Sequence, residues 1–580
     1  MEMVNVKING IAVSVPKGST ILEAARIAGV EIPTLCYMKE INEIGACRIC
    51  VVEATGARGL VTACVFPVAE GMEVQTNSPK VRAARKTTLE MILSTHDKKC
   101  LSCVRSTNCE LQKLCLEYGV DENAFAGYKP EHALDTSAAH LVRDNNKCIL
   151  CRRCVAVCRE QHVAVIGANN RGIDTCIGSA FNMDLNDTSC ISCGQCINVC
   201  PTGALTEKDD TDKVWEALAD TTKHVIVQTA PAVRAALGES FGMPIGTNVE
   251  GKMVSALRRL GFEKVFDTDF SADLTIVEEA NELIERVKNG GVLPMITSCS
   301  PGWVKFAEYY YPEQLANLST CKSPMQMMGA MIKTFYAEKM GWDAKDIVSV
   351  AVMPCTAKKF EIGRADESAA GVPDIDIAIT TRELARMIAR AGLKFEALPN
   401  EEFDSPLGED TGAAVIFGAT GGVMEAALRT ANDWLTGKDN DNVEFTEVRG
   451  TASIKEATYK IAGMDVKVAV ASGAKAAKEV MDKIASGEAD WTFVEIMGCP
   501  GGCVNGGGQP IQPQYVRDTV DIKAVRAKAL YDADQASVLR KSHKSPGIQA
   551  LYGDGKFFES YGCHKAHEYL HTSYVARKKY

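Results

Sequence analysis

The chain has 580 residues, of which 46% are hydrophobic and 24% are charged, and its formal net charge is -10. This length exceeds what one hydrophobic core organises, so about three to five domains are expected. The acidic balance argues against nucleic acid and anionic membrane surfaces as partners, and no apolar run is long enough to span a membrane.

The first segment predicts a small β-domain. Residues 4–15 alternate apolar and polar side chains around Asn9-Gly10, which indicates a β-hairpin, and a short helix follows that ends at Gly29. With the cysteines beyond it, this order resembles the β-grasp fold of plant-type ferredoxins. The first and last gaps between the cysteines are longer than in that type, as in variant modules of larger redox subunits. We therefore expect a 2Fe-2S domain over residues 1–78, with ligands Cys36, Cys47, Cys50 and Cys64.

A histidine and three cysteines follow in residues 79–126: His96, Cys100, Cys103 and Cys109. Taken alone, this set is compatible with a zinc site of three thiolates and one imidazole. Because it lies between two iron–sulfur patterns, it resembles instead the one-histidine, three-cysteine 4Fe-4S module of hydrogenases and respiratory complex I. A neutral imidazole in place of a thiolate removes one negative charge and raises the reduction potential of such a cluster.

Two four-cysteine runs in residues 127–209 are the most diagnostic pattern. They are Cys148, Cys151, Cys154 and Cys158, then Cys190, Cys193, Cys196 and Cys200. Three cysteines within seven residues and a fourth nearby predict a pair of 4Fe-4S clusters, and the fourth cysteine of each run ligates the other cluster. Zinc sites need two separated pairs, so zinc fits this spacing poorly. The prediction is one 2Fe-2S and three 4Fe-4S clusters before residue 210.

The remaining residues, 210–580, alternate apolar runs with amphipathic helical segments, which predicts α/β architecture. The strand candidates are 225–230, 292–297, 347–354, 413–420 and 491–498. Three of them lead directly to Cys299, Cys355 and Cys499, and Cys503 follows shortly after. Sites in open α/β sheets collect at the carboxyl ends of strands, so these four cysteines are candidates for one more four-iron cluster.

Three segments carry a specific resemblance: TSCSPGW (297–303), MPCTAKKFE (353–361) and EIMGCPGGCVNGGGQP (495–510). They resemble the signature motifs of FeFe hydrogenases, and the whole chain is similar to the many-cluster clostridial type. The resemblance implies a two-lobed α/β domain that holds an H-cluster, which is a 4Fe-4S cubane joined to a two-iron subsite with CO, cyanide and azadithiolate. It implies reversible interconversion of H2 with protons and electrons.

The resemblance also implies roles for residues around that centre. Cys503 matches the cysteine that bridges the cubane and the two-iron subsite, and Lys358 matches the residue that hydrogen-bonds a cyanide. The other matching positions, which surround the subsite, are Met353, Met497, Pro231, Ser323, Pro324 and Phe417.

One position departs from the family pattern. The common motif reads TSCCPGW, in which the first cysteine donates protons and the second ligates the cubane, whereas this chain has Cys299 and Ser300. Iron–sulfur clusters are held by thiolates, which favours Cys299 as the ligand and Ser300 or water as the proton relay. Matching position by position favours the reverse, with Cys299 as the relay and Ser300 as an oxygen ligand.

A proton route is expected on the segment before Cys299. Glu279, Glu282 and Arg286 recur at helical spacing, and with Ser319 they match the proton path of the family. Burial moves the pKa of a carboxylic acid toward neutrality, which suits proton transfer. The simpler reading is an exposed helix face with ordinary ion pairs.

The expected electron partners are ferredoxin, flavin-containing NADH-binding subunits, or both, since no nicotinamide or flavin site is visible in the chain. The 23 cysteines, without a recognisable signal peptide, indicate reduced thiolates that hold metal in an anaerobic cytoplasm. The competing functions are an electron-transfer subunit and a hydrogen sensor with low or no turnover. An electron relay has no need of the four C-terminal cysteines.

Overall fold

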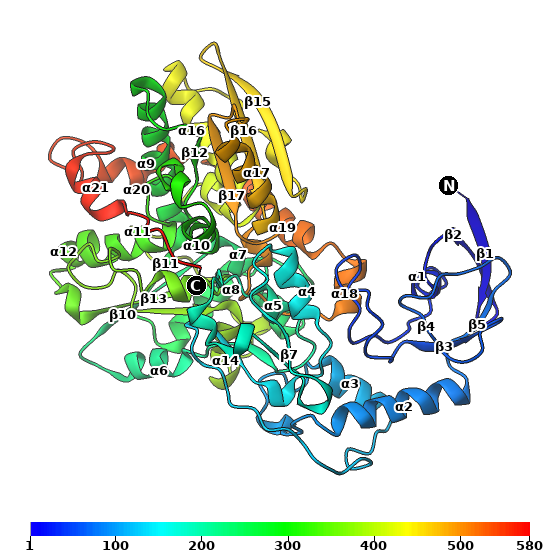
Figure 1. Cartoon of the computed structure of the whole chain (residues 1–580). Coiled ribbons are helices and arrows are strands. Elements are labelled where there is room, and N and C mark those ends of the chain that lie inside the picture. Colours follow the sequence, from blue (N-terminus) through cyan, green and yellow to red (C-terminus); the bar gives the residue numbers. More distant parts are fainter. Residues whose placement is uncertain (1, 580) are drawn as a thin grey trace.

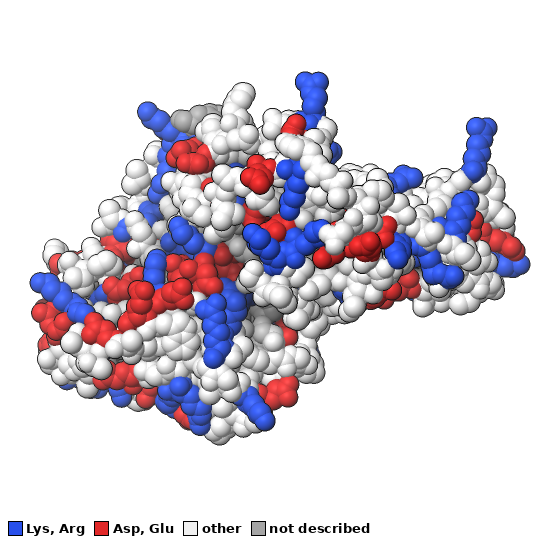
Figure 2. All heavy atoms as spheres, turned by 90° about the horizontal axis from the view of Figure 1, so that it is seen from below, with Lys and Arg blue, Asp and Glu red and all other residues white. Residues whose placement is uncertain are grey.

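The computed structural model describes residues 2–579, and within them no helix is long and apolar enough to cross a membrane. Figure 1 shows a large body built by the later part of the chain and a small N-terminal domain that projects from it. On the face shown in Figure 2, acidic and basic side chains intermix rather than form one field of a single sign.

The projecting domain is a five-stranded sheet with the order β2-β1-β5-β3-β4. Its strands are β1 (Met3–Ile8), β2 (Ile11–Pro16), β3 (Val51–Ala54), β4 (Val61–Thr62) and β5 (Glu73–Gln75). Asn9 and Gly10 join β1 to β2 with φ of 51° and 86°, the left-handed conformation that a tight hairpin turn requires. Helix α1 (Ile21–Ile27) begins with a capping box between Thr20 and Glu23, which confirms the predicted hairpin and helix.

Two cluster-binding segments connect this domain to the body. Helices α2 (Pro79–Leu93) and α3 (Glu110–Glu117) flank the His96 segment. The ferredoxin-like segment then pairs two small sheets with two helices: β6 (Leu141–Arg143), β9 (Leu205–Glu207), β7 (Gly167–Asn169), β8 (Cys176–Gly178), α4 (Arg153–Glu160) and α5 (Gln195–Asn198). Each helix lies within one cysteine run, so the internal repeat of the sequence is also a structural repeat.

The body contains two four-stranded sheets, one in each lobe. The first is parallel, with the order β11-β10-β13-β14: β11 (Lys264–Asp267), β10 (His224–Thr229), β13 (Ile347–Met353) and β14 (Ile377–Thr380). The second has the order β12-β17-β16-β15: β12 (Met295–Ile296), β17 (Phe493–Met497), β16 (Met464–Ser472) and β15 (Ile454–Ile461), of which only β15 is antiparallel to its neighbour.

Helices cover both faces of these sheets, which explains the buried apolar runs of β10, β13 and β17, whereas the edge strand β15 has polar residues at exposed positions. Val225 and Val227 of β10 point into one hydrophobic cluster and Ile226 into the opposite one, as the alternation of a strand requires. Full burial of such a side chain stabilises the fold by about 1.5–3 kcal/mol. The main helices are α8 (Glu250–Leu260), α9 (Thr268–Asn289), α10 (Pro301–Tyr310), α11 (Pro324–Met331), α14 (Thr381–Arg390), α16 (Gly422–Thr436), α17 (Ala474–Ser486), α19 (Ile522–Ala536) and α21 (His564–Leu570).

The prediction of a strand over residues 413–420 was wrong. This segment forms the short helix α15 (Gly412–Val415) and a 3-10 turn over Ile416–Gly418. A short apolar run buried on all sides has no periodicity that separates strand from helix. Its small residues permit close helix packing, since a Cβ on Gly418 would lie 2.4 Å from Leu530 of α19. The other four predicted strands are present.

Candidate active site and cluster centres

The N-terminal cysteines come together inside the β-grasp domain. The Sγ atoms of Cys50 and Cys64 lie 3.3 Å apart, and Cys36 and Cys47 form a second contacting pair. In each pair one thiol donates a hydrogen bond to the other. The hydrogen bond between Cys36 and Cys47 raises the pKa of Cys36 and lowers the pKa of Cys47 to about 6. Four converging thiols, of which some ionise readily, fit the donor set of a 2Fe-2S cluster.

His96 is buried, and its Nδ1 has no hydrogen-bond partner among residues 2–579. Burial and the charge of Lys129 lower the pKa of His96 to about 4, so the imidazole is neutral at pH 7. A neutral buried nitrogen without a partner fits a metal ligand. Cys109 Sγ lies 3.5 Å from the carbonyl of Pro201, which places this module against the end of the second four-cysteine run.

The two cysteine runs exchange their last members in space. One cavity is lined by Cys148, Cys151, Cys154 and Cys200. Cys158 in turn lies close enough to Cys190 for that thiol to raise its pKa, and Cys158 itself raises the pKa of Cys193 and of Cys196. Thus the last cysteine of each run lies beside the first three of the other, which is the arrangement that a pair of 4Fe-4S clusters requires.

Short contacts connect one centre to the next. Asn42 Nδ2 donates to the carbonyls of Cys36, at 2.7 Å, and Cys151, at 3.1 Å, so the β-grasp domain abuts the first run. At the other end, Cys499 Sγ lies 3.9 Å from the Cys193 carbonyl. A Cβ on Gly507 would lie 2.4 Å from that same carbonyl, so only glycine allows the two loops to approach this closely.

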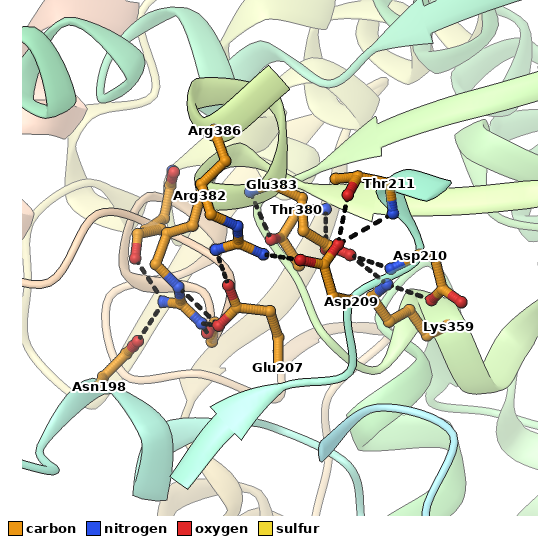
Figure 3. A network of polar contacts seen from close by, with 12 residues as sticks. Asn198, Glu207, Asp209, Asp210, Thr211, Lys359, Thr380, Arg382, Glu383 and Arg386 are labelled. Atoms are coloured by element: carbon orange, nitrogen blue, oxygen red, sulfur yellow. Dashed lines mark hydrogen bonds and ion pairs between the residues drawn. The ribbon is translucent and has the colours of Figure 1, made fainter. Parts of the chain in front are cut away.

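A buried ion-pair network holds the ferredoxin-like segment against the body (Figure 3). Arg382 of α14 donates to Glu207 at 2.7 Å and to Asn198 at 3.2 Å, both in the ferredoxin-like segment. The same guanidinium donates to the Gly507 carbonyl at 2.8 Å. Arg382 and Arg386 overcome the cost of burial and hold the pKa of Glu207 well below its usual range. Arg382 therefore ties the second cysteine run to the loop that carries Cys503.

We expect Arg382→Leu to lower the melting temperature of the anaerobic protein and to slow electron transfer between the ferredoxin-like clusters and the body. Removing one member of a buried ion pair costs about 3–5 kcal/mol. The control is Arg390→Leu, because Arg390 lies on the same helix with a side chain that is 53% exposed. Calorimetry and rapid-mixing reduction measure the two effects, and equal values for both variants would contradict this role.

The central cavity lies between the two lobes, where strands of both sheets end. Its lining includes Pro231 after β10, Cys355 after β13, and Met497 at the end of β17. The other lining residues are Ala230, Ala232, Thr268, Ala272, Cys299, Ser300, Pro324, Met325, Met353, Pro354, Lys358, Phe417, Gly418 and Cys503. Most of this wall is apolar, so thiols and one ammonium group are the main polar atoms that face the cavity.

Cys299 and Ser300 face different neighbours. Burial, the Glu279 carboxylate and Cys503 raise the pKa of Cys299 well above its ordinary value. Ser300 Oγ instead accepts a hydrogen bond of 3.0 Å from the backbone N–H of Gly498, next to Cys499. Cys355 and Cys503 are both close enough to Cys499 to raise its pKa. Ser300 therefore lies on the side of the loop near Cys499, whereas Cys299 lies on the side near Glu279.

Lys358 presents a fixed positive charge to the cavity. Its Nζ donates to Glu361 at 2.7 Å and to the Cys299 carbonyl at 3.2 Å. Burial opposes its charge, but Glu361 raises the pKa of Lys358 above the ordinary value. Ser323 does not face the cavity directly: its hydroxyl donates to Glu361 at 3.2 Å. The sequence analysis missed Glu361, although its spacing of three residues from Lys358 within one motif was a usable signal.

A line of polar groups runs from the surface to Cys299. Arg286 pairs with Glu282 at 2.6 Å, and Ser319 Oγ donates to Glu282 at 2.8 Å. Glu279 is 2% exposed and interacts with the same hydroxyl. Burial, with a contribution from Glu282, raises the pKa of Glu279 to about 8. Helix α9 carries Glu279, Glu282 and Arg286 as predicted, and Ser319 lies on a separate segment. The burial of Glu279 rules out the simpler reading of an exposed helix face with ordinary ion pairs.

Comparison with known proteins assigns families to these segments. Residues 223–507 match the iron only hydrogenase large subunit, C-terminal domain, and residues 520–577 match the iron hydrogenase small subunit. Residues 1–79 match a 2Fe-2S iron-sulfur cluster binding domain. Residues 85–124 match the NADH-ubiquinone oxidoreductase-G iron-sulfur binding region, and residues 147–204 match a 4Fe-4S dicluster domain.

Full-length relatives share this organisation. The chain is 47% identical to NADP-reducing hydrogenase subunit HndD of Solidesulfovibrio fructosivorans, with 100% of both chains covered. It is 44% identical to iron hydrogenase 1 of Clostridium pasteurianum, with 99% of this chain and 100% of that one covered. A solved apo FeFe-hydrogenase, HydA1 from Chlamydomonas reinhardtii, is 41% identical, with a TM-score of 0.55 over 63% of this chain and 99% of that chain. The chain therefore belongs to the FeFe hydrogenase family and is a hydrogenase whose H-cluster domain is preceded by 2Fe-2S and 4Fe-4S domains.

Proposed function

We propose that this hydrogenase carries electrons between its H-cluster and an external partner through one 2Fe-2S and three 4Fe-4S clusters. The observations that support this most directly are the contacts on either side of the ferredoxin-like segment: Asn42 donates to the carbonyls of Cys36 and Cys151, and Cys499 contacts the carbonyl of Cys193. The His96 module joins the same route beside Pro201. Electrons therefore enter or leave the chain of clusters at two places, the β-grasp domain and the His96 module, and they are exchanged with the H-cluster at the central cavity.

The ligands follow from the thiols that converge. The 2Fe-2S cluster is held by Cys36, Cys47, Cys50 and Cys64, and the first 4Fe-4S cluster by His96, Cys100, Cys103 and Cys109. The paired clusters are held by Cys148, Cys151, Cys154 and Cys200, and by Cys190, Cys193, Cys196 and Cys158. In the body, Cys355, Cys499 and Cys503 hold the H-cluster, with Ser300 at the fourth corner. The proposed domains are 1–78, 79–126, 127–209 and 210–580.

The H-cluster, when bound, supplies the iron chemistry that forms and splits H2. The protein shapes the space around it. Lys358 presents an ammonium group to the cavity and would donate hydrogen bonds to the anionic ligands of the two-iron subsite. Met353, Met497, Pro231, Pro324 and Phe417 exclude water, and Ser323 acts one step away by holding Glu361 beside Lys358.

Cys299 is proposed as the last proton carrier rather than as a cubane ligand. Its raised pKa keeps the thiol protonated, so Sγ holds a proton that it exchanges with Glu279. Glu279 exchanges that proton with Glu282 through the Ser319 hydroxyl. This choice differs from the one that ligand chemistry alone favours, and it is supported by the placement of Ser300 beside Gly498 and Cys499.

The partner is proposed to be a ferredoxin, flavin-containing NADH-binding subunits of a complex, or both, in an anaerobic cytoplasm. One full-length relative is named as a subunit of an NADP-reducing hydrogenase. The projecting N-terminal domain leaves much of its surface clear of the body (Figure 1). Native purification without oxygen tests the complex: flavin-containing chains should accompany the protein, and a fully active single chain would contradict it.

The function is tested by infrared spectroscopy and gas assays on the matured protein. We expect CO and cyanide stretches, and H2 evolution with a reduced dye as the electron donor. Bands without turnover would favour the alternative of a hydrogen sensor, to which the serine at position 300 also points. A complete absence of the bands after maturation would refute the assignment of the cavity.

A further inference from the structure

A pair of histidines near the end of the chain meets the carboxylate line at Glu282. His567 lies on α21, and His571 follows the end of that helix. The segment around His571 pairs with the Ser319 segment, because Thr572 N donates to the Thr320 carbonyl at 2.7 Å and Lys322 N donates to the Leu570 carbonyl at 2.8 Å. The pairing brings the C-terminal histidines to the outer end of the proton route.

The distances form an unbroken path from solvent. His567 is exposed, and its ring centroid lies 4.1 Å from that of His571, whose side chain is only 6% exposed. His571 Nδ1 lies 2.8 Å from Thr320 Oγ1. The nearest ligand atoms of His571, Glu282 and Cys321 all lie within 4.8 Å of one another. The imidazole therefore lies within the span of one bridging water of the Glu282 carboxylate, and Thr320, whose backbone N–H donates to Glu282 at 3.0 Å, contacts both side chains.

Arg286, the other polar neighbour of Glu282 near the surface, cannot exchange protons with Glu282 as an imidazole can. Arg286 is held by Glu282 and by four backbone carbonyls, at 292, 316, 317 and 318. A guanidinium keeps its proton in proteins, so Arg286 can hold Glu282 and nearby water but cannot release a proton itself. An imidazole gains and loses a proton near neutral pH, and its two nitrogens serve opposite sides of the ring.

We propose that the proton route forks at Glu282, with one arm through water at Arg286 and a second arm through His571 and His567. During H2 evolution, the imidazolium of His571 gives its proton through one bridging water to the Glu282 carboxylate, which leaves a neutral imidazole and a carboxylic acid. His567 or water then returns a proton to His571. During H2 oxidation both transfers reverse, and no electrons move. This inference rests on the proposed role of Glu282.

The charges that face His571 come from several elements. On α9, Glu278 lies 3.4 Å from Nε2 and also accepts from Tyr552 at 2.5 Å. The other titratable groups around the pair are Glu282, Cys321, His564, His567 and Tyr574. Carboxylates accept protons, and imidazoles both accept and release them. The arm therefore has groups that both load and unload a proton.

The test is a double-variant cycle with His571→Gln and Arg286→Gln, assayed for H2 turnover across pH. If the arms run in parallel, each single change costs severalfold at most, whereas the double change costs about tenfold more than the product of the single effects. The control is Glu568→Gln, on the same helix and exposed. In addition, free imidazole should restore turnover to His571→Ala, which a purely structural role does not allow.

Further measurements distinguish a failure of the histidine arm from a failure of the proposed role of Glu282. The infrared carboxyl band of Glu282, identified by its loss in Glu282→Gln, should change its pH dependence in His571→Gln. Multiplicative effects without imidazole rescue would overturn the fork. If Glu282→Gln keeps full turnover, the carboxylate route itself is wrong. If Glu282→Gln loses turnover but His571→Gln and the double variant do not, the carboxylate route is supported and the histidine arm is wrong. If His571→Gln does not fold, His567→Gln at the exposed end carries the same test.

Discussion

Cys299→Ser is expected to lower H2 turnover by about 10²–10⁴-fold while the iron content of the purified protein stays unchanged. The reason is that the Cys299 thiol lies beside Glu279 and Cys503, whereas Ser300 lies beside Gly498 and Cys499. A serine hydroxyl is a far weaker acid than a thiol, so it exchanges protons with Glu279 too slowly to support turnover. Dye-linked H2 assays and iron analysis measure the two effects.

Two further variants accompany this experiment. Ser300→Cys should keep turnover and increase the retention of iron, because a thiolate replaces an oxygen donor at the fourth corner. Cys176→Ser is the matched control, since Cys176 is also a buried thiol but is not among the proposed ligands and does not line the central cavity. Loss of about four iron atoms in Cys299→Ser would show instead that Cys299 is the ligand. Iron content therefore decides between the two assignments that the motif leaves open.

Glu279→Gln is expected to lower H2 turnover by a similar factor, because an amide of the same shape cannot exchange a proton. The control is Glu285→Gln, an exposed position on the same helix α9. H2 evolution by the unchanged protein should decline as pH rises past about 8, where Glu279 loses its proton. Unaltered turnover in Glu279→Gln would mean that protons reach Cys299 by another route.

The same carboxyl group should make stability depend on pH. Its pKa is raised from 4.5 in an exposed state to about 8 in the folded protein, so the folded state binds the proton more tightly. The resulting stabilisation is complete below about pH 4.5 and is lost as pH rises through about 8. Melting temperatures measured across this interval should therefore fall less steeply for Glu279→Gln. An identical slope would contradict the raised pKa.

Local spacing determined much of this protein. The clustered cysteines of the ferredoxin-like segment, the hairpin at Asn9-Gly10 and the helical periodicity of Glu279, Glu282 and Arg286 can all be recognised within a few residues of sequence. Each depends on short-range geometry: a ferredoxin-type motif places three ligands within a few residues, a tight turn needs left-handed residues, and one helix face repeats every three or four positions.

Long-range packing decided the rest. Only the folded chain shows that Cys299 faces Glu279 while Ser300 faces Gly498, because adjacent residues point to different sides of a loop whose path is set by two lobes. The failed strand at 413–420 has the same origin, since its helix depends on contacts with α9 and α19. His571 lies 289 positions from Glu282 in the sequence, yet their ligand atoms are within 4.8 Å in space. Sequence periodicity carries no information on such contacts, because they depend on how distant segments pack together.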